Sequence, residues 1–211
     1  MRRMIAAGPP AKRPPHITFR GTAGWSAAFA TIGFALLVAL SPAGTAEEEQ
    51  IKLGEFIPAT PPQPAPEAAF TDLEGKPLSL TDFKGKPAVV NLWATWCEPC
   101  LKEMPSLDRL QAEFDGKLAV AAVSEDRGGA KLVVPFVDKM GLKKLVVYLD
   151  PKSELGHALH VRGLPTSIVL DPAGRVVGKV EGGAKWDSEQ MLAVLRPLLE
   201  SPASPLKKAQ R

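Results

Sequence analysis

The chain has 211 residues, a formal net charge of +3 and only two cysteines. This length fits one domain with additional segments, and such a domain can bury a core without stabilising disulfides. The first 46 residues carry five basic and no acidic side chains, so the rest of the chain is near neutral. This distribution argues against a clustered basic face that would bind nucleic acid.

The first 46 residues have the features of an export segment. Residues 21–40 are uncharged and largely apolar, they follow the basic residues, and a stretch of about 20 such residues can span a bilayer. The positive flank predicts a cytoplasmic N-terminus and an exported remainder. Small residues at Gly44 and Ala46 also fit a signal cleavage site. We expect either a membrane anchor, slightly favoured by its length, on the periplasmic side of the inner membrane, or a soluble periplasmic protein cleaved after Ala46.

Residues 47–68 are polar and rich in proline, which predicts an extended linker between the export segment and a folded domain over 69–200. Residues 201–211 form a predicted flexible basic tail. Apolar periodicity and turn residues predict the following elements in chain order: a hairpin of 70–73 and 77–80, a strand at 88–93, a helix at 99–114, a strand at 118–123, a helix at 130–140, a strand at 145–149, a short helix at 153–160, a hairpin of 166–170 and 176–181, and a helix at 187–199. This order predicts an α/β domain with a central mixed sheet covered by helices on both faces.

The two cysteines, Cys97 and Cys100, follow the apolar strand and stand at the predicted start of a helix. Free backbone N–H groups and the helix dipole favour a thiolate at the first cysteine, and the thiolate is the nucleophile. The second cysteine lies one turn on, close enough to resolve a mixed disulfide. The spacing therefore predicts thiol–disulfide exchange in which Cys97 attacks and Cys100 resolves. No bound cofactor is needed, because the dithiol carries both electrons.

A metal site is the main alternative. His157 and His160 are spaced i, i+3 on a predicted short helix, and two cysteines with two histidines are a common zinc ligand set. The alternative function is therefore a copper- or zinc-binding module or chaperone that uses Cys97 and Cys100 with these histidines. Most such histidine pairs are ordinary surface residues, so we expect no metal ligands in the primary site.

Three segments carry a resemblance to a known family: Asn91-Leu-Trp-Ala-Thr-Trp-Cys-Glu-Pro-Cys-Leu-Lys-Glu-Met-Pro105, Leu78-Ser-Leu-Thr-Asp-Phe-Lys-Gly85 and Gly163-Leu-Pro-Thr-Ser-Ile-Val-Leu-Asp171. They resemble the TlpA-like branch of the thioredoxin superfamily, which includes ResA- and CcmG-type proteins. The resemblance extends from about Phe70 to Leu199. It implies a thioredoxin-like fold, preceded here by an N-terminal hydrophobic segment, and the activity of a thiol–disulfide oxidoreductase.

The resemblance also implies roles for individual residues. Pro165 would be a cis-proline beside the dithiol, and it would present the client backbone together with Leu164 and Thr166. Glu103 would assist proton transfer to and from the dithiol, although a solvated helix glutamate is the alternative. Trp96 would cover one side of the dithiol and meet partners.

Asn91 departs from thioredoxin, which keeps a buried aspartate at that position. This departure puts a thioredoxin-type buried acid in doubt and leaves Glu103, Glu125 or solvent as the proton acceptor. Glu125 and Asp126 follow an apolar strand, at the edge of the sheet where ligands gather in open α/β folds. A polar loop is an equally good interpretation of these two acids.

The function that the resemblance implies is an exported reductase of disulfides in periplasmic client proteins, with electrons supplied by a membrane thiol transporter. The clients would belong to the biogenesis of the cytochrome oxidase copper site or of cytochrome c. A disulfide donor would use the same residues, and only the reduction potential separates it from a reductase.

Overall fold

The centre of the domain is strand β4 (Ala88–Trp93), in which all six residues are buried. The computed structural model describes residues 54–200, and in this part β4 lies between β5 and β7 in an eight-stranded mixed sheet of order β1-β8-β7-β4-β5-β6-β2-β3. The other strands are β1 (Phe56–Pro64), β2 (Ala69–Thr71), β3 (Pro77–Ser79), β5 (Ala119–Ser124), β6 (Val146–Leu149), β7 (Thr166–Leu170) and β8 (Arg175–Glu181). The three strands β4, β5 and β6 run parallel, and the remaining neighbours pair antiparallel. The predicted mixed sheet is confirmed.

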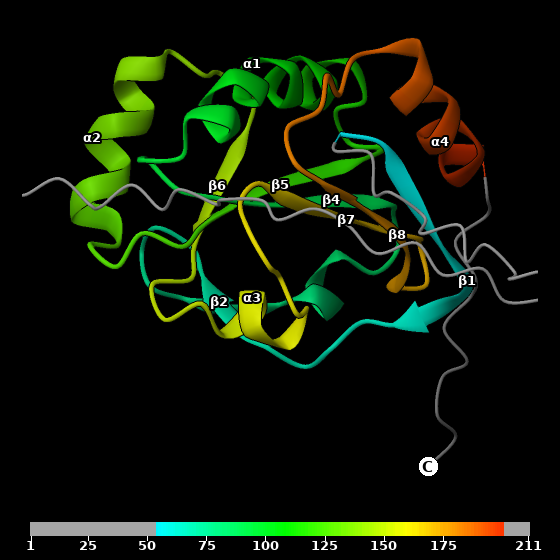
Figure 1. Cartoon of the computed structure of the whole chain (residues 1–211), viewed down its shortest axis with the longest axis horizontal. Helices are drawn as coiled ribbons and strands as arrows, with labels where there is room; N and C mark the ends of the chain where they lie inside the picture. Colours follow the sequence, from blue (N-terminus) through cyan, green and yellow to red (C-terminus); the bar gives the residue numbers. More distant parts are fainter. Residues whose placement is uncertain (1–53, 201–211) are drawn as a thin grey trace, which may run out of the picture. The chain divides into compact units, whose positions relative to one another are not determined.

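Helices cover both faces of this sheet, which explains why β4 buries residues on both of its faces and has no exposed polar side (Figure 1). They are α1 (Glu98–Glu113), α2 (Ala130–Met140), α3 (Glu154–Ala158) and α4 (Glu189–Glu200), with a 3-10 turn η1 (Leu80–Phe83). Val89 and Trp93 of β4 pack in one core cluster with α1 and α4, whereas Val90 and Leu92 pack in the other with Leu155 of α3. Because side chains alternate along a strand, Asn91 is directed to the same face as Val89 and Trp93, under α1.

The edge strand β1 corrects the predicted linker. Residues 56–64, inside the proline-rich stretch expected to be a linker, pair antiparallel with β8 instead. Proline fits an edge strand because the side that faces away from the sheet needs no N–H donor. The folded unit therefore begins before residue 69.

The export segment 1–46, the start of the linker through residue 53 and the tail 201–211 lie outside the described residues. Within residues 54–200, no helix is long and apolar enough to cross a membrane.

Strand β1 packs closely against Gly178 of β8, and Gly178 pairs with Pro58 of β1. A Cβ atom at position 178 would lie 2.6 Å from the Ile57 carbonyl oxygen and 2.3 Å from Cζ of Phe56. We expect Gly178→Ala to lower the free energy of unfolding by about 1–3 kcal/mol, as overpacking does elsewhere. Urea unfolding of the oxidised protein measures this change.

Gly163→Ala is the matched control, because a Cβ atom at position 163 would meet nothing within 4 Å. Its unfolding midpoint should stay close to that of the parent protein. Equal midpoints for the two variants would show that β1 does not depend on this contact.

Candidate active site

The two cysteines stand at the turn that joins β4 to α1. The backbone N–H of Cys97 donates to the Ala94 carbonyl at 3.1 Å, which closes the turn, and Cys97 is the N-cap of α1. Its sulfur accepts the Cys100 backbone N–H at 3.3 Å. Cys97 and Cys100 form a disulfide with a Cα–Cα distance of 5.3 Å. The dithiol therefore lies at a helix N-terminus, where the sequence predicts it and where a thiolate is stabilised.

The two sulfur-bearing residues differ in exposure. Cys97 keeps 5% of its surface exposed, whereas Cys100 is fully buried. The neighbouring Trp96 is 72% exposed and stands out from the surface next to Cys97. The disulfide is therefore accessible from the Cys97 side only, an arrangement consistent with an attacking Cys97 and a resolving Cys100.

Asp126 fixes the turn from the end of β5. Its buried carboxylate accepts the backbone N–H and the hydroxyl of Thr95, each at 2.8 Å, and the Ser124 hydroxyl at 2.8 Å. Thr95 directly precedes Trp96 and lies inside the turn closed by Cys97. The acid at this strand end is thus a support of the active-site turn rather than part of a polar loop.

Glu125 points elsewhere. It is half-buried against α3, where a Cβ atom on Gly156 would come within 2.1 Å of its Oε1. Burial raises the pKa of Glu125, the negative charge of Asp150 raises it further, and Ser153 and His157 act in the opposite direction. Its environment is therefore built by α3 and the preceding loop.

The metal alternative finds no support in the arrangement of side chains. Among residues 54–200, no group of three or more His, Cys, Asp or Glu side chains is placed to hold a metal ion. The structure therefore does not bring His157 and His160 into one site with the two cysteines.

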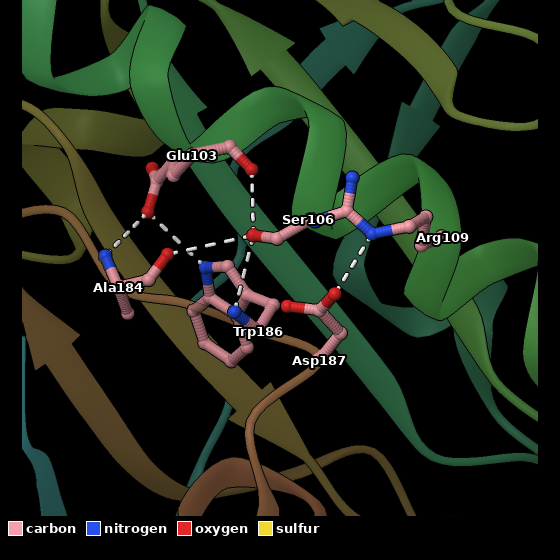
Figure 2. A network of polar contacts seen from close by, with 6 residues as sticks. All are labelled: Glu103, Ser106, Arg109, Ala184, Trp186 and Asp187. Carbon is pink, nitrogen blue, oxygen red and sulfur yellow. Dashed lines mark hydrogen bonds and ion pairs between the residues drawn. The ribbon is translucent and has the colours of Figure 1, made fainter.

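Glu103 is the buried acid of the site (Figure 2). It lies three residues after Cys100 on α1 and is only 3% exposed, so the interpretation of a solvated helix glutamate is wrong. Its Oε1 accepts the Asn91 amide at 2.7 Å, and its Oε2 accepts the Ala184 backbone N–H at 2.9 Å and the Trp186 indole N–H at 3.1 Å. The Asn91 amide also donates to the Ser167 hydroxyl at 2.9 Å, which ties β4 to β7 beneath the carboxylate.

The protonation of Glu103 follows from two opposed influences. Burial raises the pKa of Glu103, because the charged form loses its water. The hydrogen bonds from Ala184, Asn91 and Trp186 lower the pKa of Glu103. The effect of burial is larger, so the pKa lies above its ordinary value. A carboxyl group with a raised pKa is better matched to proton exchange with a thiol than an ordinary glutamate is.

Pro165 follows Leu164 through a cis peptide bond, as the resemblance implies. The Pro165 carbonyl accepts the Gly182 N–H at 2.9 Å, and the Thr166 hydroxyl donates to the Gly163 carbonyl at 2.7 Å. A cavity of about 360 Å³ is lined by Pro99, Arg162, Gly163, Leu164, Pro165, Thr166, Glu181, Gly182 and Gly183. Pro99, which stands between the two cysteines, and the cis-proline therefore share one cavity.

Two functional residues were not assigned from the sequence. Trp186 and Ser106 surround Glu103, and the Ser106 hydroxyl donates to the Glu103 carbonyl at 2.7 Å while it accepts the Trp186 backbone N–H at 3.1 Å. The i, i+3 spacing of Glu103 and Ser106 on one helix face was the available signal for Ser106. Trp186 lies 83 residues from Glu103 in sequence, and no local pattern connects the two.

Comparison with known proteins also identifies thiol–disulfide oxidoreductases as relatives of this chain. The sequence model of the AhpC/TSA family matches residues 61–179. The thiol-disulfide oxidoreductase ResA of Bacillus thuringiensis subsp. konkukian is 34% identical over 152 residues, which cover 72% of this chain and 83% of the relative. The thioredoxin-like protein YneN of Bacillus subtilis is 37% identical over 134 residues, covering 62% of this chain and 77% of the relative.

Solved structures of thioredoxin-family proteins also resemble this chain. The crystal structure of the thioredoxin domain of a thiol-disulfide oxidoreductase from Bacteroides vulgatus superimposes with a TM-score of 0.54 at 26% identity, over 65% of this chain and 96% of that one. A thiol:disulfide interchange protein of the thioredoxin family from Chlorobium tepidum gives a TM-score of 0.52 at 28% identity, over 64% and 96% of the two chains. With the paired cysteines at the start of α1 and the cis-proline beside them, the chain belongs to the AhpC/TSA family and is a thiol–disulfide oxidoreductase of the TlpA/ResA type in the thioredoxin superfamily.

Proposed function

We propose that the protein is an exported reductase of disulfides in periplasmic client proteins. The observation that carries the proposal is the unequal exposure of the dithiol: Cys97 opens toward the surface beside Trp96, whereas Cys100 is fully buried. The cavity that Pro99 shares with Pro165 gives an extended client segment a place beside Cys97. Leu164, Pro165 and Thr166 present the backbone against which that segment lies.

The exchange proceeds in two steps. The Cys97 thiolate attacks one sulfur of the client disulfide, the client S–S bond breaks, and the other client sulfur leaves and takes up a proton. The Cys100 thiol then gives its proton to the Glu103 carboxylate and attacks the Cys97 sulfur. The Cys97–Cys100 disulfide forms as the Cys97–client S–S bond breaks, and the second client sulfur leaves as a thiolate that takes up a proton equivalent to the one passed to Glu103, through solvent. The client has then gained two electrons and two protons.

The compartment and the electron supply that we propose rest on the predicted export segment and on the resemblance to the TlpA-like proteins. The periplasm is kept oxidising, so a reductant there needs a supply of electrons from another protein, and a membrane thiol transporter is the donor we propose. Residues 21–40 anchor the protein to the inner membrane, or cleavage after Ala46 releases it into the periplasm. Clients belong to the biogenesis of cytochrome c or of the cytochrome oxidase copper site.

The reduction potential decides the direction of electron flow. We expect the Cys97–Cys100 couple to lie below the roughly −180 mV of protein disulfide isomerase, toward the roughly −270 mV of thioredoxin. Equilibration against glutathione and dithiothreitol, with the oxidised fraction read by thiol labelling, gives the value. A potential near the roughly −120 mV of DsbA would make the protein an oxidant and sink the proposal of a reductase.

Trapping tests the order of the two cysteines. Removal of the resolving thiol in Cys100→Ala should leave the client attached to Cys97 as a stable mixed disulfide, because no second thiol can release it. Non-reducing electrophoresis of a periplasmic fraction followed by mass spectrometry detects the adduct. The matched control is Cys97→Ala, in which the remaining thiol is buried and should trap little; equal trapping by both variants would contradict the assignment.

The proton role of Glu103 predicts a pH effect. Glu103→Gln should slow resolution of the mixed disulfide near neutral pH by about 10²-fold or more, since general acid–base catalysis contributes on this scale. The loss should be smaller at high pH, where the Cys100 thiol ionises without help. Stopped-flow reduction of a disulfide peptide across pH 5–10 measures both, and a parallel profile for the parent and the variant would count against this role.

A further inference from the structure

The loop between β8 and α4, residues 182–188, contacts the cis-proline, α1 and Glu103. The Gly182 N–H donates to the Pro165 carbonyl at 2.9 Å. Gly183 passes so close to α1 that a Cβ atom there would lie 3.2 Å from the Pro99 carbonyl oxygen. Ala184 and Trp186 of the same loop supply two of the three donors to the Glu103 carboxylate (Figure 2).

Trp186 is a residue of this loop that makes two hydrogen bonds to α1. It is only 1% exposed, and its indole N–H donates to Oε2 of Glu103 at 3.1 Å. Its backbone N–H donates to the Ser106 hydroxyl at 3.1 Å, and that hydroxyl donates to the Glu103 carbonyl at 2.7 Å. Trp186 is thus bound through its side chain and its backbone to a single turn of α1. This geometry fixes the direction of the indole N–H.

We propose that Trp186 is a positioning residue for thiol–disulfide exchange, whose indole N–H holds the Glu103 carboxylate in one orientation and favours its ionised form. A hydrogen bond to the charged form of a carboxyl group favours that form, and here it offsets part of the cost of burial. Without the indole donor, Glu103 keeps its proton to higher pH and accepts the proton of Cys100 only at that higher pH. The inference rests on the proton-accepting role proposed above for Glu103.

The charged groups around Glu103 leave its titration easy to isolate. From α1 these are Lys102 and Arg109, and from the opposite side Lys185 and Asp187; Lys102, Arg109 and Lys185 line one cavity of about 490 Å³ with Glu103. Arg109 pairs with Asp187 at 2.8 Å. The sheet contributes uncharged groups, the amide of Asn91 and the hydroxyl of Ser167. Cys97 and Cys100 are joined in a disulfide in the oxidised protein, so neither thiol titrates there.

The test is a titration of oxidised full-length protein. NMR of protein labelled with ¹³C at the glutamate carboxyl groups follows Glu103, whose signal is assigned by its loss in Glu103→Gln. We expect Trp186→Phe, which keeps an aromatic ring but removes the N–H, to raise the titration midpoint by about one pH unit. The pH profile of disulfide reduction should move upward by the same amount in the reduced protein.

Trp93→Phe is the matched control. Trp93 is also fully buried in the core cluster under α1, but its indole N–H has no hydrogen-bond partner in the described part of the chain. This variant should leave the Glu103 midpoint where it is. A shift as large as that of Trp186→Phe would mean that loss of packing, rather than loss of the donor, moves the midpoint, and the proposal would fail.

A titration of the parent protein tests the same proposal if Trp186→Phe does not fold. In the parent protein, the ¹⁵N-bound indole proton of Trp186 should titrate with the midpoint of Glu103, and the effect should vanish in Glu103→Gln. An indole signal that stays constant through that midpoint overturns the inference. If Trp186→Phe shifts the midpoint while Glu103→Gln leaves the reduction profile intact, the proton role itself is wrong, and the positioning role falls with it.

Discussion

A carboxyl group that is almost fully buried must be surrounded by hydrogen-bond donors, and at Glu103 this requirement organises the functional half of the domain. The donors come from β4 and from the loop before α4, so the carboxylate joins α1 to both. The same loop contacts the cis-proline through Gly182. The helix that carries the cysteines, the cis-proline Pro165 and the buried Glu103 are therefore held in place by the same loop.

The place of this acid distinguishes the site from that of thioredoxin. Where thioredoxin keeps an aspartate on the central strand, this chain has Asn91, and its amide donates to Glu103 instead of taking a proton. The acid has in effect moved from the sheet to the helix that carries the cysteines. Since Glu103 and Cys100 are spaced i, i+3, they share one face of α1, so the position of the acid follows any movement of the resolving cysteine.

Patterns within a short stretch of sequence predicted the frame of the fold and the dithiol. The apolar run of β4 and the start of α1 at the cysteines could be found because burial on both faces and helical spacing leave local signatures. Strand β1 could not, because its four prolines and its lack of apolar–polar alternation argue against a strand in the sequence alone. The burial of Glu103 was equally hidden, since its donors Ala184 and Trp186 come from 81 and 83 residues away.

The full burial of Cys100 has a consequence for the catalytic cycle as a whole. For the reductase proposed above, only Cys97 is within reach of a partner, so its client and its electron donor would use the same surface around Trp96. The two partners would then take turns on this surface. Turnover would follow a ping-pong course in which an excess of either partner inhibits the other half of the cycle.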